Sequence, residues 1–186
     1  MKKKTWIIIA IVVAVIGGYL VMSYNSLAGL GQKVEAAWAN VETQYQRRAD
    51  LIPNLVSTVK GYASHEQETL NQVVEARANA LSVGKSVEEY VAAQNQVNTA
   101  LGKLIAIAES YPDLKANTNF LDLQAQLEGT ENRIAVARKD YNETVKEYNT
   151  KTVTFPSNII ANMFGFEKKQ LFTADEGTAS APKVEF

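Results

Sequence analysis

Catalysis by a nucleophile or a base requires particular side chains, and this sequence supplies few of them. It contains no Cys, which excludes a thiol nucleophile, and its single His, His65, is the only imidazole available as a base. Ser64 and Glu66 flank His65, but adjacent positions on a helix do not face one another, so these residues cannot form a Ser–His–acid triad. We therefore expect a protein that is not an enzyme.

A bound metal or nucleotide has little more support. Carboxylate-bridged two-metal sites in helical bundles use paired Glu-x-x-His motifs, whereas the residue three positions before His65 is Tyr62. The sequence also has no glycine-rich loop of the kind that cradles a phosphate group. It thus predicts no metal ion and no other cofactor.

His65 fits a structural role better. Counting along the expected helices brings it level with Glu131 and with the stretch that contains Gln94 and Asn98. A mid-bundle layer of these four side chains would satisfy its members by hydrogen bonds and would fix helix register at some cost in stability. A ligand site or a proton relay at His65 is the functional alternative.

A second polar set is expected at the distal turn, the end of the bundle farthest from the chain's apolar N-terminal segment. Capping and solvated ion pairs would explain these residues, and each such pair contributes little to stability. A partner-binding surface is the alternative. The set comprises Arg47, Arg48, Asp50, Pro53, Glu109, Tyr111 and Asn117.

The N-terminal segment itself is predicted to cross a membrane. Thr5–Tyr24 carries no charge, follows Lys2–Lys4, and precedes the next charged residue, Lys33. As a helix it would span about 30 Å, the thickness of the hydrocarbon core of a bilayer. Because the positive charges precede the span, we expect residues 1–4 in the cytoplasm, a transmembrane helix over 5–24, and the remainder outside the cytosol.

A cleaved secretory signal is the competing interpretation. Ser26-Leu27-Ala28 could serve as the cleavage site, but the apolar run is longer than the roughly 7–15 residues of such a signal. An uncleaved signal-anchor fits better. Small residues recur every four positions along the span, and such a seam lets two membrane helices approach closely. The candidates for this self-association are Ala10, Ala14 and Gly18.

Beyond the span, apolar residues at three- and four-residue spacing predict helices over about 27–49, 52–81 and 86–108. A fourth helix carries a strict seven-residue repeat, formed by Phe120, Leu127, Ile134, Tyr141 and Tyr148. Long helices with short connections are typical of up-and-down bundles. We predict an all-α fold, in which an N-terminal transmembrane helix precedes an antiparallel four-helix bundle over 25–150 and a short C-terminal amphipathic helix.

The topology depends on Asp50–Pro53. Asp50 can cap a new helix, and Pro53 is tolerated in a first turn. If the chain turns there, four helices of matched length pack side by side. If it only kinks, the first helix becomes much longer than the third. We expect the turn, because matched lengths bury more apolar surface.

The C-terminal segment, 151–172, has an apolar face. It could fold back onto the bundle, dock on a partner subunit, or lie in the membrane interface. Four helices would return the chain to the lipid surface at this segment. Residues 173–186 are predicted to form a flexible tail. The apolar face comprises Ile159, Ile160, Met163, Phe164 and Phe166.

Four stretches of the chain resemble signature segments of the LemA family. The resemblance implies a bacterial membrane protein with a short N-terminal span and an antiparallel helical bundle, but it implies no activity. Some members are associated with internal membrane compartments, which suggests a membrane-organising role. Residues 173–186 lie outside the resemblance. The stretches are 47–56 (RRADLIPNLV), 61–66 (GYASHE), 109–117 (ESYPDLKAN) and 130–135 (TENRIA).

These observations favour a non-catalytic scaffold or assembly partner in the bacterial cell envelope. The expected partners are the membrane, other envelope proteins and further copies of the chain in a homo-oligomer. Nucleic acid is disfavoured, because 19 basic and 20 acidic residues give a net charge of −1 and form no basic stripe. The alternative is an extracytoplasmic module that senses a small ligand or lipid in the bundle interior.

Overall fold

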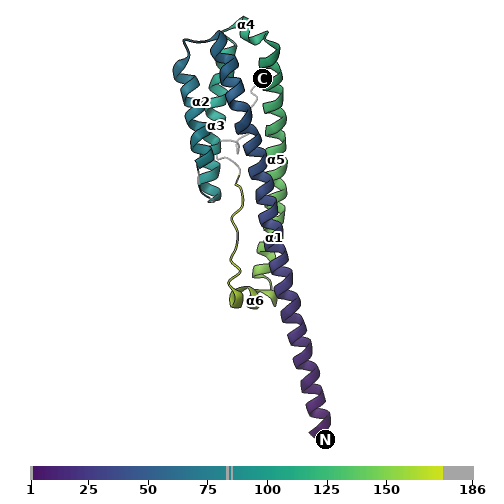
Figure 1. Ribbon diagram of the computed structural model, residues 1–186. Coiled ribbons are helices and arrows are strands. Elements are labelled where there is room, and N and C mark those ends of the chain that lie inside the picture. Colours follow the sequence, from purple (N-terminus) through teal and green to yellow (C-terminus); the bar gives the residue numbers. More distant parts are fainter. Residues whose placement is uncertain (1, 83, 85, 174–186) are drawn as a thin grey trace, which may run out of the picture. The chain divides into compact units, whose positions relative to one another are not determined.

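The computed structural model describes residues 2–82, 84 and 86–173. These residues form six helices, and no strand occurs among them, which confirms the all-α class (Figure 1). The helices are α1 (Lys2–Tyr62), α2 (Gln67–Ser82), α3 (Val87–Ala108), α4 (Pro112–Lys115), α5 (Thr118–Val153) and α6 (Ser157–Phe164).

The chain divides into two compact units, and helices α1 and α5 contribute to both. The first unit comprises the residues up to Ala39 together with Lys139–Gln170, and so contains the apolar N-terminal segment and α6. The second comprises, among the described residues, Asn40–Arg138 and 171–173, and contains α2, α3 and α4.

The second unit has the helical bundle that the sequence predicts. The C-terminal part of α1, then α2, α3 and the N-terminal part of α5 follow one another through short connections, with α4 in the connection between α3 and α5. Short connections between neighbouring helices make them antiparallel. All five helices contribute to one buried apolar core, whose larger side chains are Ile52, Leu55, Val59, Leu70, Val73, Val97, Leu101, Leu104, Leu114, Phe120 and Leu127.

The predicted turn at Asp50–Pro53 is wrong. Helix α1 continues through Pro53 to Tyr62, and the chain reverses at residues 63–66 instead. Asp50 does not cap a helix but accepts a hydrogen bond of 2.8 Å from Gln46 Nε2 within α1. The physical reason is a seam of buried side chains that keeps the same helix face in the core on both sides of the proline: Val34, Val41, Tyr45, Ile52, Leu55 and Val59.

The seven-residue repeat of α5 lies in the interior, since all five of its residues are buried. Asn117 caps the start of this helix, because its Oδ1 accepts the backbone N–H of Phe120 at 3.0 Å. The seven-residue pattern of α5 therefore predicts correctly which of its residues are buried. At the start of α3, Ser86 occupies the N-cap position, but its side chain makes no capping hydrogen bond.

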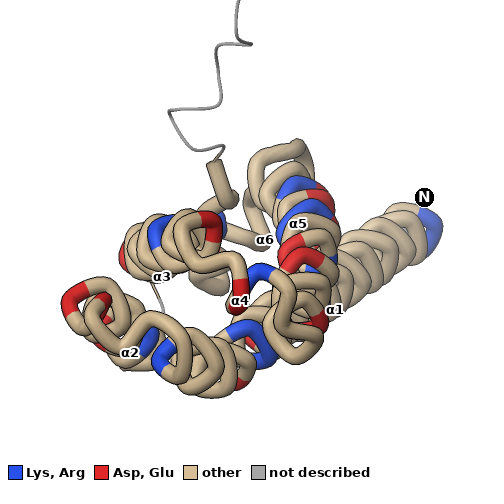
Figure 2. Tube along the Cα trace, turned by 90° about the horizontal axis from the view of Figure 1, so that it is seen from above, with Lys and Arg blue, Asp and Glu red and all other residues tan. Residues whose placement is uncertain are grey.

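The N-terminal part of α1 is apolar and uncovered. Its large side chains from Trp6 to Met22 are exposed, and Figure 2 shows this part of the helix without charge beyond its basic N-terminal end. Among the described residues, α1 is the one helix long and apolar enough to cross a membrane. Ala10, Ala14 and Gly18 are also exposed here, and their self-association stays a prediction.

The remainder of the first unit forms where α5 and α6 meet α1. Trp38 of α1 and Tyr141 of α5 pack edge to face, with ring centroids 5.5 Å apart. Further toward the N-terminus, Leu27 forms a buried cluster with Ile160 and Ala161 of α6. Helix α6 is thus fixed to α1 close to the end of the apolar segment.

After α6 the chain returns along α5. Gly165 ends α6 in the left-handed conformation, with φ of 73°. Asn149 then holds the backbone of Lys169 from both sides: its Nδ2 donates to the carbonyl oxygen and its Oδ1 accepts the N–H, each at 2.8 Å. Tyr141 donates its hydroxyl to the carbonyl oxygen of Gln170 at 3.0 Å. The segment therefore folds back onto its own chain.

In the second unit, Arg138 of α5 holds the last described residues. Its Nη2 donates to the carbonyl oxygen of Thr173 at 3.2 Å, and its guanidinium lies 5.0 Å from the centroid of the buried Phe172 ring. The flexible tail predicted for 173–186 lies outside the described residues from position 174 onward.

Candidate functional site

The centre of the bundle contains a buried charge, Arg48 of α1, which is 2% exposed. Burying a charge is costly unless it is paired and hydrogen-bonded. Arg48 meets this requirement: Nη1 donates to Glu131 Oε2 at 2.9 Å and to Asn98 Oδ1, and Nη2 donates to Gln94 Oε1 at 2.5 Å. Helices α1, α3 and α5 therefore meet at one guanidinium group.

The ion pair within this cluster is unequally buried. Glu131 has a side chain that is 51% exposed, so water reaches its carboxylate from the α5 side. Gln94, in contrast, is buried, and its side-chain and backbone oxygens both face Arg48. We expect the buried amide to contribute more to the position of Arg48 than the solvated carboxylate.

Two tyrosines lie beside the guanidinium. The ring of Tyr45 is 5.0 Å from Arg48 Cζ, and the rings of Tyr45 and Tyr90 pack edge to face at 5.3 Å. Burial raises the pKa of Tyr45, and burial, with a further contribution from the Glu42 carboxylate, raises the pKa of Tyr90 to about 12. Both phenols are therefore neutral at physiological pH, and neither serves as a base.

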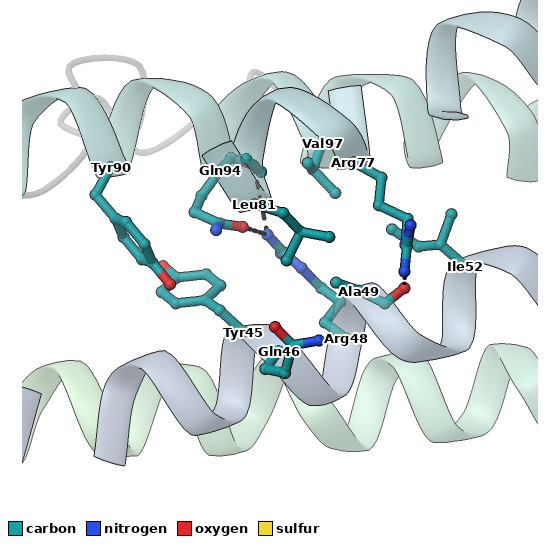
Figure 3. A pocket seen from close by; sticks show the side chains of 11 residues that line it. Tyr45, Gln46, Arg48, Ala49, Ile52, Arg77, Leu81, Tyr90, Gln94 and Val97 are labelled. Atoms are coloured by element: carbon teal, nitrogen blue, oxygen red, sulfur yellow. Dashed lines mark hydrogen bonds between the residues drawn. The ribbon is translucent and has the colours of Figure 1, made fainter. Parts of the chain in front are cut away.

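A cavity of about 30 Å³ adjoins Arg48 between α1, α2 and α3 (Figure 3). A buried water needs at least about 10–15 Å³ of such space, whereas pockets for organic ligands measure about 300–1,000 Å³. The cavity therefore suits a buried water and is too small for a metabolite. It is lined by Tyr45, Gln46, Arg48, Ala49, Ile52, Arg77, Ala80, Leu81, Tyr90, Gln94 and Val97.

On the α2 side of the cavity, Arg77 Nε donates to the carbonyl oxygen of Ala49 at 2.7 Å (Figure 3). In a regular helix this carbonyl would accept the N–H of residue 53, but Pro53 has none. Arg77 thus supplies from a neighbouring helix the donor that α1 lacks.

The predicted mid-bundle layer is assembled in part. The structure brings Glu131, Gln94 and Asn98 together, but around Arg48 and not around His65. The placement of His65 in this layer is wrong: His65 lies exposed in the turn between α1 and α2. The reason is the continuation of α1 to Tyr62, which moves His65 from mid-helix to a helix end.

The predicted distal turn does not form one cluster, and its N-terminal half is misplaced. Arg47, Asp50 and Pro53 are exposed positions in the interior of α1, and Arg48 faces the core. Their predicted placement depends on a turn that the structure does not have.

The other half of the distal set does lie at the end of the bundle. Tyr111 donates its hydroxyl to Glu66 Oε1 at 3.1 Å, and Asn117 Nδ2 donates to the hydroxyl oxygen of Tyr62 at 2.9 Å. Glu109, the C-cap residue of α3, is exposed and precedes Tyr111 by two residues. These contacts join the α1–α2 turn to the α3–α5 connection.

The C-terminal apolar set divides into two faces. Ile160 is buried against α1 and Phe166 is partly buried with it, whereas Ile159, Met163 and Phe164 are exposed. No group of three or more His, Cys, Asp or Glu residues suited to a metal ion occurs among the described residues.

The predicted placement of Arg48 in the distal turn is wrong, although its spacing in the sequence indicates a buried position. Arg48 falls on the same three- and four-residue spacing as Val41, Tyr45, Ile52 and Leu55, and it is the charged member of that seam. A charged residue in phase with an apolar seam indicates a buried, paired charge. The same seam, followed across Pro53, also indicates an uninterrupted helix.

Comparison with known proteins agrees with this architecture. Residues 37–186 match the sequence profile of the LemA family. The chain belongs to the LemA family. The matched stretch includes the whole bundle and α6. It also includes residues 173–186, so the expectation that they lie outside the resemblance is wrong. With its apolar N-terminal helix, this LemA family member fits a membrane-associated protein.

The individual relatives have low sequence identity to this chain. The chain is 27% identical over 178 residues to magnetosome protein MamQ 2 of Paramagnetospirillum magneticum and 25% identical over 178 residues to magnetosome protein MamQ of Magnetospirillum gryphiswaldense. It is 24% identical over 152 residues to protein LemA of Metamycoplasma hominis. Each match covers 82% of this chain, with 65% of either MamQ protein and 69% of the LemA protein. None of these names is that of an enzyme.

The four stretches that resemble LemA signature segments meet in pairs in this LemA family member. Stretches 47–56 and 130–135 meet through Arg48 and Glu131. Stretches 61–66 and 109–117 meet at the end of the bundle, through the bonds of Tyr62 to Asn117 and of Glu66 to Tyr111. Segments distant in the sequence thus form two polar contacts within one bundle.

Proposed function

We propose that this protein is a single-pass, membrane-anchored scaffold or assembly partner of the bacterial cell envelope, with its bundle outside the cytoplasm and without a catalytic role. The observation that carries the proposal is the continuity of α1. This one helix supplies both the exposed apolar stretch and core positions such as Ile52 and Leu55. Removing the anchor from the bundle would require breaking a helix.

The contacts around Leu27 support a retained anchor over a cleaved signal. Leu27 is fully buried against Ile160 and Ala161, and Tyr24 packs against Phe164. Cleavage after Ala28 would remove both Leu27 and Tyr24 and would expose the apolar side chains that they cover. We therefore favour an uncleaved signal-anchor.

The chemistry of the bundle centre supports a structural role over a catalytic one. The guanidinium of Arg48 is committed to three acceptor side chains, and the neighbouring phenols of Tyr45 and Tyr90 are neutral. A buried polar cluster of this kind can fix the register of the helices it joins. The relatives named magnetosome proteins support a role in a larger assembly.

The sensing of a small ligand in the bundle interior has less support. A roomy polar cavity at His65 would favour sensing, but His65 is exposed in a turn. The cavity beside Arg48 has room only for water. A lipid or metabolite does not fit the cavity beside Arg48, whereas scaffolding requires no interior cavity.

Site-specific photo-crosslinking in intact cells tests the scaffold. A photoreactive amino acid would replace Val74 or Val136, which are exposed apolar positions of the bundle, in the full-length protein. Leu104, fully buried, provides the matched control position. We expect discrete adducts from the exposed positions, identified by mass spectrometry and by reciprocal pull-down, and none from Leu104.

The adducts also distinguish the two kinds of assembly. Adducts of twice the chain mass indicate a homo-oligomer, and adducts with other envelope proteins indicate a scaffold for them. Recovery of monomer alone from every exposed position would overturn the proposal.

A further inference from the structure

Helix α6 has a large apolar face that the described residues of its chain leave exposed. Ile159, Met163 and Phe164 are exposed in this helix, Met163 at 65%, and the preceding Phe155 is 80% exposed. Helix α6 itself contains no charged residue. The opposite side is firmly held, since Ile160 is 1% exposed in its contact with Leu27. The exposed face therefore belongs to an ordered helix.

The position of α6 along α1 indicates which surroundings its exposed face has. Tyr24, the last residue of the predicted membrane span, packs edge to face with Phe164 at 4.9 Å and with Phe166 at 5.6 Å. Leu27, less than one turn further, contacts the buried side of α6. Helix α6 thus lies at the level where the apolar stretch ends and where tyrosine rings favour the boundary between lipid and water.

The corner before α6 fixes this arrangement. Ser157 Oγ donates toward the carbonyl oxygens of Lys151 at 2.7 Å and Thr154 at 2.9 Å, closing the connection from α5. Val21 and Met22 of α1, which precede the contact of Tyr24 with α6, are exposed as well.

We infer that α6 is an interfacial helix of the membrane that α1 spans, with Phe155, Ile159 and Met163 inserted between the lipid headgroups and the upper acyl chains. Short apolar faces bind this boundary in proportion to the area that they bury. Lys168 and Lys169, both exposed after α6, can face lipid phosphates, with Glu167 as the one acidic neighbour in that segment. The inference rests on the transmembrane assignment of α1 in the proposed function and not on the scaffold role.

Depth-dependent quenching tests the inference directly. The chain contains no Cys, so a single introduced Cys can carry an environment-sensitive fluorophore. Met163→Cys reports on α6, Val13→Cys on the membrane segment and Val136→Cys on an exposed bundle position, and all three native side chains are exposed. The full-length protein is placed at one copy per phosphatidylcholine nanodisc that contains lipids with a nitroxide quencher either near the headgroup or deep in the acyl chain.

We expect the Met163→Cys label to shift to shorter wavelength and to be quenched about twofold more by the shallow than by the deep nitroxide, because an interfacial helix lies about 5–10 Å deep. The Val13→Cys label should show the opposite preference, and the Val136→Cys label should resist both. Ile159→Cys gives a second reading of the same face.

The outcomes separate this inference from the proposed function. If Val13→Cys is quenched but Met163→Cys and Ile159→Cys behave like Val136→Cys, α6 is not interfacial although the anchor holds. If Val13→Cys also resists quenching, the anchor itself is wrong. If the Met163→Cys label becomes shielded only when several copies share a nanodisc, a second copy and not lipid covers the face, which overturns the inference.

Discussion

Arg77 on α2 donates from Nε to the carbonyl oxygen of Ala49 on α1 at 2.7 Å, and this bond accompanies the passage of α1 through Pro53. A proline in a helix interior removes one hydrogen bond and costs about 3 kcal/mol. Ala49 is buried, so its carbonyl would otherwise lie without a partner in the bundle. The two features, proline and arginine, are therefore expected to be energetically coupled.

A double-mutant cycle tests this coupling. Arg77→Met should lower the free energy of unfolding by about 1–3 kcal/mol, the cost of a buried polar group without its partner. Pro53→Ala restores the N–H that the Ala49 carbonyl lacks, and it should stabilise the protein by up to about 3 kcal/mol. In the Pro53→Ala background, Arg77→Met should cost clearly less, as measured by urea unfolding in detergent.

Lys103→Met on the neighbouring α3 is the matched control for this cycle. It also exchanges a cation for an apolar side chain, but at an exposed position. It should change the free energy of unfolding by less than about 0.5 kcal/mol in both backgrounds. Equal costs of Arg77→Met with and without Pro53 would contradict the coupling.

The course of α1 shows which part of the fold can be read from the sequence. Helix content, the apolar span and the buried repeat of α5 all follow from spacing, because a strict pattern leaves one face to bury. Local rules for proline and capping predict a turn at Asp50–Pro53. Tertiary contacts override such rules: Arg77, distant in sequence, satisfies the freed carbonyl.

The candidate site is predictable to a similar extent. The sequence groups Gln94, Asn98 and Glu131 correctly, because their level along the helices depends only on α3 and α5. It misidentifies their partner, since the level of His65 depends on where α1 ends. The role of Arg48 emerges only when the seam of α1 is followed across Pro53.

The polar cluster gives a second prediction. Arg48→Met should destabilise the bundle by about 1–3 kcal/mol, because it leaves the buried Gln94 amide without its donor. Glu131→Gln should cost less, since that side chain is 51% exposed and its charge is screened. The double variant should cost less than the sum of the two, measured in one unfolding series.

His65→Leu is the matched control for this series. His65 is exposed in a turn, so its replacement should change the free energy of unfolding by less than about 0.5 kcal/mol. A stable Arg48→Met protein together with an unstable His65→Leu protein would restore the layer around His65 and reject the one around Arg48.

Alkaline pH gives a third prediction. Burial, with the Glu42 carboxylate, raises the pKa of Tyr90 to about 12 from 10.0. Between these values the unfolded chain loses the phenolic proton while the folded chain keeps it, so the folded state binds more protons and stability falls as pH rises. This contribution of Tyr90 is fully present below pH 10 and is lost between about pH 10 and 12.

Tyr90→Phe isolates that contribution, because other tyrosines also titrate in this range. The stability of the variant should fall less steeply than that of the natural chain above pH 10, as followed by circular dichroism during urea unfolding. Identical slopes for the natural chain and Tyr90→Phe would show that the Tyr90 phenol titrates alike in both states.

The orientation of the anchor gives the fourth prediction. Lys2–Lys4 precede the apolar stretch, and positive charge is retained on the cytoplasmic side. Because the chain has no Cys, a single Ala125→Cys at an exposed position of α5 or a single Lys3→Cys at the N-terminus can be labelled selectively. In intact cells a membrane-impermeant maleimide should label Ala125→Cys but not Lys3→Cys, and permeabilised cells should label both.

The reverse pattern would place the bundle in the cytoplasm. Labelling of Ala125→Cys in a protein that has lost its N-terminus would indicate a cleaved signal. The burial of Leu27 against α6 argues against such cleavage.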